Sequence, residues 1–246
     1  MYELICIGAS WGGLQAVGQV LSDIPADVRQ PVVIAQHRHK DTREGTLAEL
    51  LQLRIGRPVQ DVEDKTPIEA GHVYIAPPDY HLLVQRGSFA LSVEERVQYA
   101  RPSIDVMFES AAYAYGPAVI GIILTGANRD GAAGLALIKR RGGVVVVQDP
   151  AGALRRAMPE AAIAATAADA ILPLEEIGKF VYGLCVTPAV REPAAKPPVR
   201  ASGPVEGGAE RLSAKRTSGG GLGEPGGSPS SDRGAREVPP AETKVP

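Results

Sequence analysis

The stretch Tyr2–Leu21 reads YELICIGASWGGLQAVGQVL and sets the pattern for the whole chain. Its first part is rich in β-forming residues up to Ile7, and from Leu14 onward apolar residues recur at helical spacing. A glycine-rich turn, Gly8–Gly13, separates the two parts. A strand that passes through a tight turn into a helix is the first half of a β-α-β unit. We therefore expect a parallel sheet covered by helices.

The same alternation continues outward from this stretch. We expect further strands at 32–35, 72–76, 119–124, 144–147 and 170–172, and further helices at 42–53, 104–113, 131–141 and 175–184. Within Leu82–Val93, the turn signal Arg86-Gly87-Ser88 predicts a β-hairpin. The predicted fold class is α/β: a doubly wound, mostly parallel sheet with helices on both faces and an inserted β-hairpin.

Composition divides the 246 residues into two parts. From residue 187 to the end, Gly and Pro make up one third of the residues and aromatic residues are absent, whereas before that point Gly and Pro make up about one sixth. A segment with so few large apolar residues cannot offset the entropy lost on ordering. We therefore expect one folded domain at 1–186 and a disordered Gly/Pro-rich tail at 187–246.

Charge and residue counts exclude several classes of protein. Lys plus Arg is 26 and Asp plus Glu is 28, for a net charge of −2, which argues against a nucleic-acid binder. Apolar runs are too short for membrane insertion, and the N-terminus lacks a signal peptide. Two cysteines and four histidines show neither disulfide nor metal-ligand spacing, so no metal is expected. A cytoplasmic location follows as the expectation.

Three candidate catalytic residues follow three of the expected strands. Ser10 lies in the turn after the first strand, His37 follows the second, and Asp130 follows the strand at 119–124. Ligands bind at the carboxyl edge of such sheets, and serine, histidine and aspartate are the groups that acyl transfer needs. Gly8-Ala9-Ser10-Trp11-Gly12 also fits G-x-S-x-G, in which a sharp turn exposes the serine hydroxyl.

Simpler roles are open for these residues. Ser10 fits the N-cap of the following helix, and Asp130 fits a cap of the helix that starts near Gly131. A nucleotide-binding turn fits poorly, because G-x-G-x-x-G and a Walker A pattern are absent and His37 follows the second strand where an acidic residue would be expected. Asp105 is interpreted as an acid in the first turn of a helix.

Seven blocks of sequence between about residues 2 and 184 together resemble the catalytic domain of the CheB-type chemotaxis receptor methylesterases. The blocks are Ile7-Gly8-Ala9-Ser10 with Gly12-Gly13, Gln36-His37, 71–77 (GHVYIAP), 101–106 (RPSIDV), 123–126 (ILTG), 130–134 (DGAAG) and 158–161 (MPEA). The resemblance implies that Ser10 is the nucleophile, His37 the general base and Asp130 the residue that orients the histidine. It further implies hydrolysis of glutamyl methyl esters on receptor signalling helices, with glutamine deamidation in some members, and no cofactor.

The chain also differs from the family pattern. Trp11 stands where members commonly have a small hydroxyl residue, and Ala127-Asn128 replaces Met-Gly. Arg38-His39-Lys40 stands where an apolar residue and proline are frequent. Trp11, Gly12 and Ala127 are candidates for the oxyanion hole or pocket. Many members carry an N-terminal receiver domain; because the first catalytic strand starts at Tyr2, we expect no such switch in cis and leave open a regulator that acts in trans.

Two other functions remain open at the level of sequence. One is a binding or signalling module of the same fold with weak turnover, in which Trp11 fills the pocket. The other is a hydrolase that acts on an ester or amide outside receptors. The leading hypothesis is a serine methylesterase whose partners are methylated receptor signalling helices.

Overall fold

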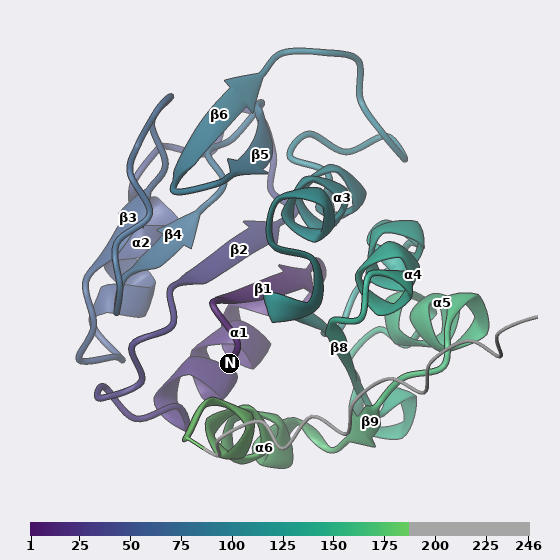
Figure 1. Ribbon diagram of the computed structural model, residues 1–246. Helices are drawn as coiled ribbons and strands as arrows, with labels where there is room; N and C mark the ends of the chain where they lie inside the picture. Colours follow the sequence, from purple (N-terminus) through teal and green to yellow (C-terminus); the bar gives the residue numbers. More distant parts are fainter. Residues whose placement is uncertain (187–246) are drawn as a thin grey trace, which may run out of the picture. The chain divides into compact units, whose positions relative to one another are not determined.

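Strand β1 (Leu4–Ala9) lies at the centre of a seven-stranded parallel sheet (Figure 1). The computed structural model describes residues 1–186, so the tail expected at 187–246 lies outside the described residues. The strand order is β3-β4-β2-β1-β7-β8-β9, and every neighbouring pair is parallel. The expected α/β class is confirmed, and the sheet proves wholly parallel.

The remaining elements alternate along the chain as the sequence pattern indicates. The other strands of the sheet are β2 (Val32–Gln36), β3 (Val59–Asp61), β4 (Val73–Ile75), β7 (Val119–Ile123), β8 (Val144–Gln148) and β9 (Ala170–Leu172). The helices are α1 (Gly13–Ser22), α2 (Thr46–Gln52), α3 (Ile104–Tyr115), α4 (Ala132–Arg140), α5 (Ala157–Ala165) and α6 (Leu174–Val186), with short 3₁₀ turns η1 (Gly116–Ala118) and η2 (Pro150–Gly152).

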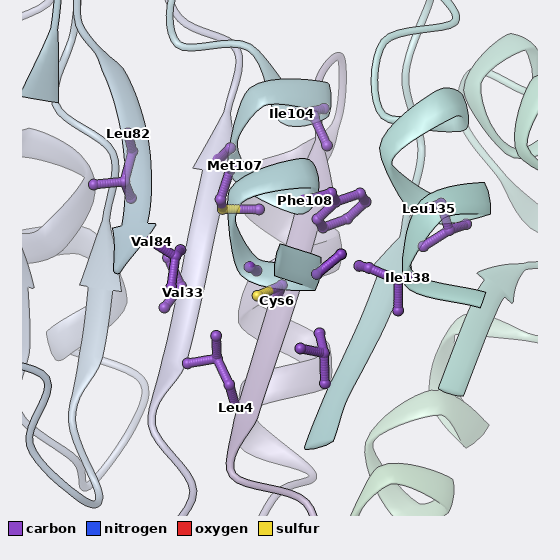
Figure 2. Close-up of a cluster of buried hydrophobic side chains, with 14 of the residues drawn as sticks. Leu4, Cys6, Val33, Leu82, Val84, Ile104, Met107, Phe108, Leu135 and Ile138 are labelled. Atoms are coloured by element: carbon purple, nitrogen blue, oxygen red, sulfur yellow. The ribbon is translucent and has the colours of Figure 1, made fainter. Parts of the chain in front are cut away.

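The alternation of side chains along β1 divides the core between the two faces of the sheet. Leu4 and Cys6 point to a cluster that also includes Phe108 of α3 and Leu135 of α4 (Figure 2). Ile5 and its same-face neighbours join a second cluster built with α1, α2 and α6. All six residues of β1 are buried, as expected of a strand covered on both faces. The sheet is therefore held from both sides, and its carboxyl edge is a rigid platform.

The predicted hairpin is present as a separate two-stranded antiparallel sheet, β5 (His81–Gln85) and β6 (Ser88–Ser92). Leu82, Val84 and Phe89 of this hairpin are buried in the same cluster as Phe108. The hairpin therefore packs on the face of the sheet that α3 covers, and it extends that layer (Figure 1).

Two elements were not expected from the sequence, and one begins later than expected. Strand β3 has only three residues, none of them fully buried, so its apolar signal is weak. Helix α5 is rich in alanine and has little amphipathic pattern, which hides its period. Helix α2 starts at Thr46 rather than near residue 42, because Gly45 adopts a left-handed conformation (φ 79°) immediately before it.

Candidate active site

The chain reverses its direction of travel across the sheet at β1. Strand β2 pairs with one edge of β1, and β7 pairs with the other. The helices that follow, α1 after β1 and α4 after β7, cover opposite faces. A crevice opens at the carboxyl ends of strands where such a reversal occurs. The residues that follow β1, β2 and β7 therefore form the candidate site, and these include Ser10, His37 and Asp130.

Asp130 is the buried anchor of this site. Its side chain is 0% exposed and accepts four hydrogen bonds. Two come from side chains, at 2.7 Å from His37 Nε2 and at 2.8 Å from Ser103 Oγ. Two come from backbone N–H groups in the first turn of α3, at 2.7 Å from Ile104 and 3.0 Å from Asp105. The carboxylate thus lies at the positive end of a helix, which stabilises its charge.

These contacts decide the charge state of Asp130. Burial raises the pKa of the carboxyl group, but the hydrogen bond from His37 and those from the α3 backbone outweigh burial and hold the pKa below its ordinary value. Asp130 does not cap α4, because Gly131 is the N-cap and the first-turn N–H of Gly134 donates to Asp105 instead. Gly131 has φ 94°, and a Cβ there would lie 2.6 Å from Ile104 Cγ2, so only glycine fits beside the anchor.

The hydrogen bonds around His37 assign its tautomer. Nε2 faces the Asp130 carboxylate, which can only accept, so Nε2 has the proton. Asn128 Oδ1 accepts from the Asp130 N–H at 3.2 Å, which turns Asn128 Nδ2 toward His37 Nδ1 at 3.4 Å. An amide nitrogen can only donate, so Nδ1 offers its lone pair. The imidazole therefore presents the lone pair of Nδ1 on the side away from Asp130.

Ser10 is fixed through its backbone, while its hydroxyl is free. Its N–H donates to Thr125 O at 2.9 Å, and its carbonyl accepts from Gln36 Nε2 at 2.7 Å. Within residues 1–186 the hydroxyl has no hydrogen-bond partner, and it makes no hydrogen bond to His37. The N-cap of α1 is Gly12, so the alternative that Ser10 caps this helix is wrong.

Unpaired N–H groups occur in the turns that follow β1 and β7. Among the residues that the structure describes, the N–H groups of Trp11, Gly12 and Ala127 have no acceptor. The Trp11 ring is 61% exposed, and Arg155 Cζ lies 5.5 Å from its centroid. Trp11 is therefore largely exposed, and its effect on substrate access stays a prediction.

Supporting side chains were missed by sequence reasoning. Gln36 bridges the carbonyls of Ser10 and His37, at 2.7 and 3.0 Å, and so ties two strand ends together. Ser103 is the N-cap of α3 and also a donor to Asp130. Its place at the start of a helix is visible in the sequence, but its link to Asp130 is not, because the two are far apart in the chain.

Asp105 lies in the first turn of a helix, as expected, and its side chain links two helices. It lies in the first turn of α3, and its Oδ1 accepts from the Gly134 N–H at 2.8 Å, which joins α3 to α4. Burial raises the pKa of Asp105 to about 6, and the nearby Asp130 charge adds to the rise. Asp105 is therefore a structural acid beside the site.

Two further features of the described residues bear on other functions. Within residues 1–186, no cluster of three or more His, Cys, Asp or Glu side chains has an arrangement that would hold a metal ion. No helix in that same part of the chain has the length and apolar character needed to span a membrane.

Comparison with known proteins gives a consistent family. The family model described as CheB methylesterase matches residues 5–181. A putative protein-glutamate methylesterase/protein-glutamine glutaminase of Leptospira interrogans is 45% identical over 184 residues, covering 74% of this chain and 95% of that protein. The protein-glutamate methylesterase FrzG of Myxococcus xanthus is 41% identical over 178 residues, covering 72% of this chain and 53% of its own length.

A solved structure supports the same family. The crystal structure of the Thermotoga maritima CheB methylesterase catalytic domain aligns with a TM-score of 0.69 and 30% identity, covering 75% of this chain and 99% of that one. The chain thus spans nearly all of the Leptospira protein and the Thermotoga domain, and about half of FrzG.

Proposed function

The chain belongs to the CheB methylesterase family, and we propose that it demethylates glutamyl methyl esters on chemoreceptor-like proteins through Ser10, His37 and Asp130. Its enzyme class is protein-glutamate methylesterase. The observation that supports the proposed residues best is the 2.7 Å hydrogen bond between His37 Nε2 and Asp130 Oδ2, next to a free serine hydroxyl on the neighbouring strand end.

In the proposed first step, His37 Nδ1 exchanges the Asn128 amide for the Ser10 hydroxyl and accepts its proton. Ser10 Oγ then attacks the ester carbonyl, because a serine hydroxyl without a base is a weak nucleophile at neutral pH. Asp130 stays ionised and stabilises the imidazolium that forms, as its low pKa requires. General-base help of this kind contributes about 10²–10⁴ in rate.

The negative charge that develops on the carbonyl oxygen needs donors. The free N–H groups of Trp11, Gly12 and Ala127 are the proposed donors, since they have no competing acceptor within residues 1–186. Collapse of the intermediate releases methanol, which takes the proton from His37. Water then hydrolyses the acyl-enzyme and leaves glutamate on the substrate. A glutamine side chain would follow the same path with ammonia as the leaving group, which is the proposed basis of any deamidation.

Methylated receptor signalling helices are the proposed partners. A cytoplasmic location, a regulator that acts in trans, and the division into a domain at 1–186 and a tail remain predictions. No observation in the structure favours the weakly active binding module or the hydrolase of other esters, and the following experiment separates all three.

The test is methanol release from a methylated receptor cytoplasmic fragment. We expect Ser10→Ala to lower the rate by about 10³-fold or more without unfolding the chain, because the nucleophile is lost. Ser22→Ala is a matched control, since Ser22 ends α1 and its hydroxyl donates to Gly18 O, remote from the sheet edge that bears Ser10.

Each alternative has its own result. Near-normal release by Ser10→Ala would overturn the proposed nucleophile. Binding of the fragment without release by either protein would favour the binding module. Turnover of small esters without turnover of the fragment would favour a different substrate.

A further inference from the structure

A cationic cavity opens directly beside His37. Its volume is about 280 Å³, and His37 and Asn128 form part of its wall. The charged groups in the remaining wall are all basic, and no Asp or Glu side chain lines it. The basic residues are Arg38, His39, Lys40, Arg96 and Arg101. Carboxylates lie behind this wall, because Asp61 pairs with Arg38, Asp41 with His39, and Asp79 with both Arg96 and Arg101.

Arg38 contributes a buried charge that has one carboxylate partner and two unpaired donors. Its side chain is 6% exposed. Nη2 donates to Ala76 O and forms an ion pair with Asp61 Oδ1 at 3.4 Å. Nε and Nη1 are buried and have no hydrogen-bond partner among the described residues. A buried cation with unmet donors is costly unless an anion lies close to it. Arg38 forms part of the cavity wall, but its guanidinium is almost wholly covered, so its charge acts on the cavity from beneath the surface.

The other cations at the cavity differ in the number of hydrogen bonds and ion pairs that they form. Arg101 is committed to the fold, because it donates to Asp79 Oδ1 at 2.8 Å and to the carbonyls of Val93 and Glu94. Arg96 is half exposed and lies 3.4 Å from the same Asp79 oxygen. Lys40 is exposed and has no ionic partner within residues 1–186. Lys40 and Arg96 can therefore turn toward an incoming anion.

We propose that this cavity binds the carboxylate of an acidic side chain located about one helical turn from the scissile ester on a helical substrate. Residues three or four apart on a helix have Cβ atoms about 5–6 Å apart. An ester that reaches His37 would thus place such a carboxylate at the cavity that His37 itself lines. The inference rests on the proposed function, and it adds a preference for acidic neighbours that the catalytic residues alone do not supply.

The test uses two helical peptides that each contain one glutamyl γ-methyl ester. One has Glu and the other Gln at the position four residues from the ester. We expect the wild-type protein to have a kcat/KM about tenfold higher for the Glu peptide, as one charge-assisted contact would provide. In the double variant Lys40→Gln/Arg96→Gln, the ratio should fall to about one, and Arg38→Met should reduce it as well. A matched control is Lys179→Gln, an exposed cation on α6 outside the cavity wall, which should keep the ratio.

A binding measurement separates this proposal from the proposed function. Fluorescence anisotropy with Ser10→Ala and the same labelled peptides reports affinity without turnover. Tighter binding of the Glu peptide that is lost in the added Lys40→Gln/Arg96→Gln background would support the cavity even if the wild-type protein released no methanol. Equal affinity of Ser10→Ala for both peptides, or a preference that survives removal of Lys40 and Arg96, would overturn the proposal whatever the turnover.

Discussion

Asp130 and Asp105 are neighbouring buried carboxylates with opposite pKa shifts. Asp130 accepts four hydrogen bonds, from His37, Ser103 and the first turn of α3, and its pKa lies below the ordinary value. Asp105 accepts from the Gly134 N–H, and burial raises its pKa to about 6. Burial acts on both groups in the same direction. The number and charge of the hydrogen-bond donors therefore decide the direction in which the pKa of each carboxyl group shifts.

The comparison is tested most strongly at Asp130. We expect Asp130→Asn to lower methanol release by about 10²–10⁴-fold, because the amide no longer fixes the His37 tautomer or stabilises the imidazolium. The variant should also lose about 1–3 kcal/mol in the free energy of unfolding at neutral pH, since an NH₂ group would face donors. Turnover and urea unfolding measure the two effects, with exposed Asp27→Asn as the control.

The pH dependence of that stability loss follows from the sign of the shift. Asp130 has a folded-state pKa below 3.8, so its stabilising contribution is present above about pH 4 and is lost as the pH falls through the lower folded value. The stability gap between wild type and Asp130→Asn should shrink in acid. A gap that grows on acidification would contradict the lowered pKa.

Asp105 should respond in the opposite direction. Its folded-state pKa of about 6 lies above 3.8, so its contribution is fully present below about pH 4 and is lost as the pH rises through 6. At pH 8 the buried carboxylate therefore costs stability. Asn can still accept from the Gly134 N–H, and we expect Asp105→Asn to be more stable than wild type by about 1–3 kcal/mol at pH 8. Thermal and urea unfolding of both proteins at pH 5 and pH 8 check this. A wild type that is more stable than Asp105→Asn at pH 8 would refute it.

Substitution of Ser103 is expected to have the smallest effect, because it removes only one hydrogen bond to Asp130. Ser103→Ala removes one of the four donors to Asp130 and the side-chain cap of α3. We expect a loss of about 1 kcal/mol in stability and a three- to tenfold loss of turnover. Ser103→Thr keeps the hydroxyl and should restore most of both. If Ser103→Thr were as impaired as Ser103→Ala, the hydroxyl would not be the group that matters.

The sequence predicts the strand ends better than it predicts what supports them. Ser10, His37 and Asp130 each follow a buried apolar run, so their shared position at one edge of the sheet could be anticipated from the order of elements. The donors to Asp130 could not, because they come from the start of α3, which precedes β7 in the chain and reaches Asp130 only through packing on the sheet.

The spacing of apolar residues also fails to predict an element where that spacing is weak. The alanine-rich α5 has no clear apolar stripe, and the three-residue strand β3 has no fully buried side chain. The role of Asn128 at His37 Nδ1 is a matter of tertiary geometry, since the loop after β7 decides where its amide points. The family resemblance, in contrast, was readable from the sequence, because it depends on short blocks in a fixed order.

The donation of two α3 amides to Asp130 couples chemistry to local unfolding. Fraying of the first turn of α3 would withdraw the Ile104 and Asp105 N–H groups and leave the carboxylate without half of its donors. Under the proposed mechanism, the chain would then lose activity while most of its core is intact. Hydrogen exchange at these two amides would report the fraction of catalytically competent molecules directly, without any substrate.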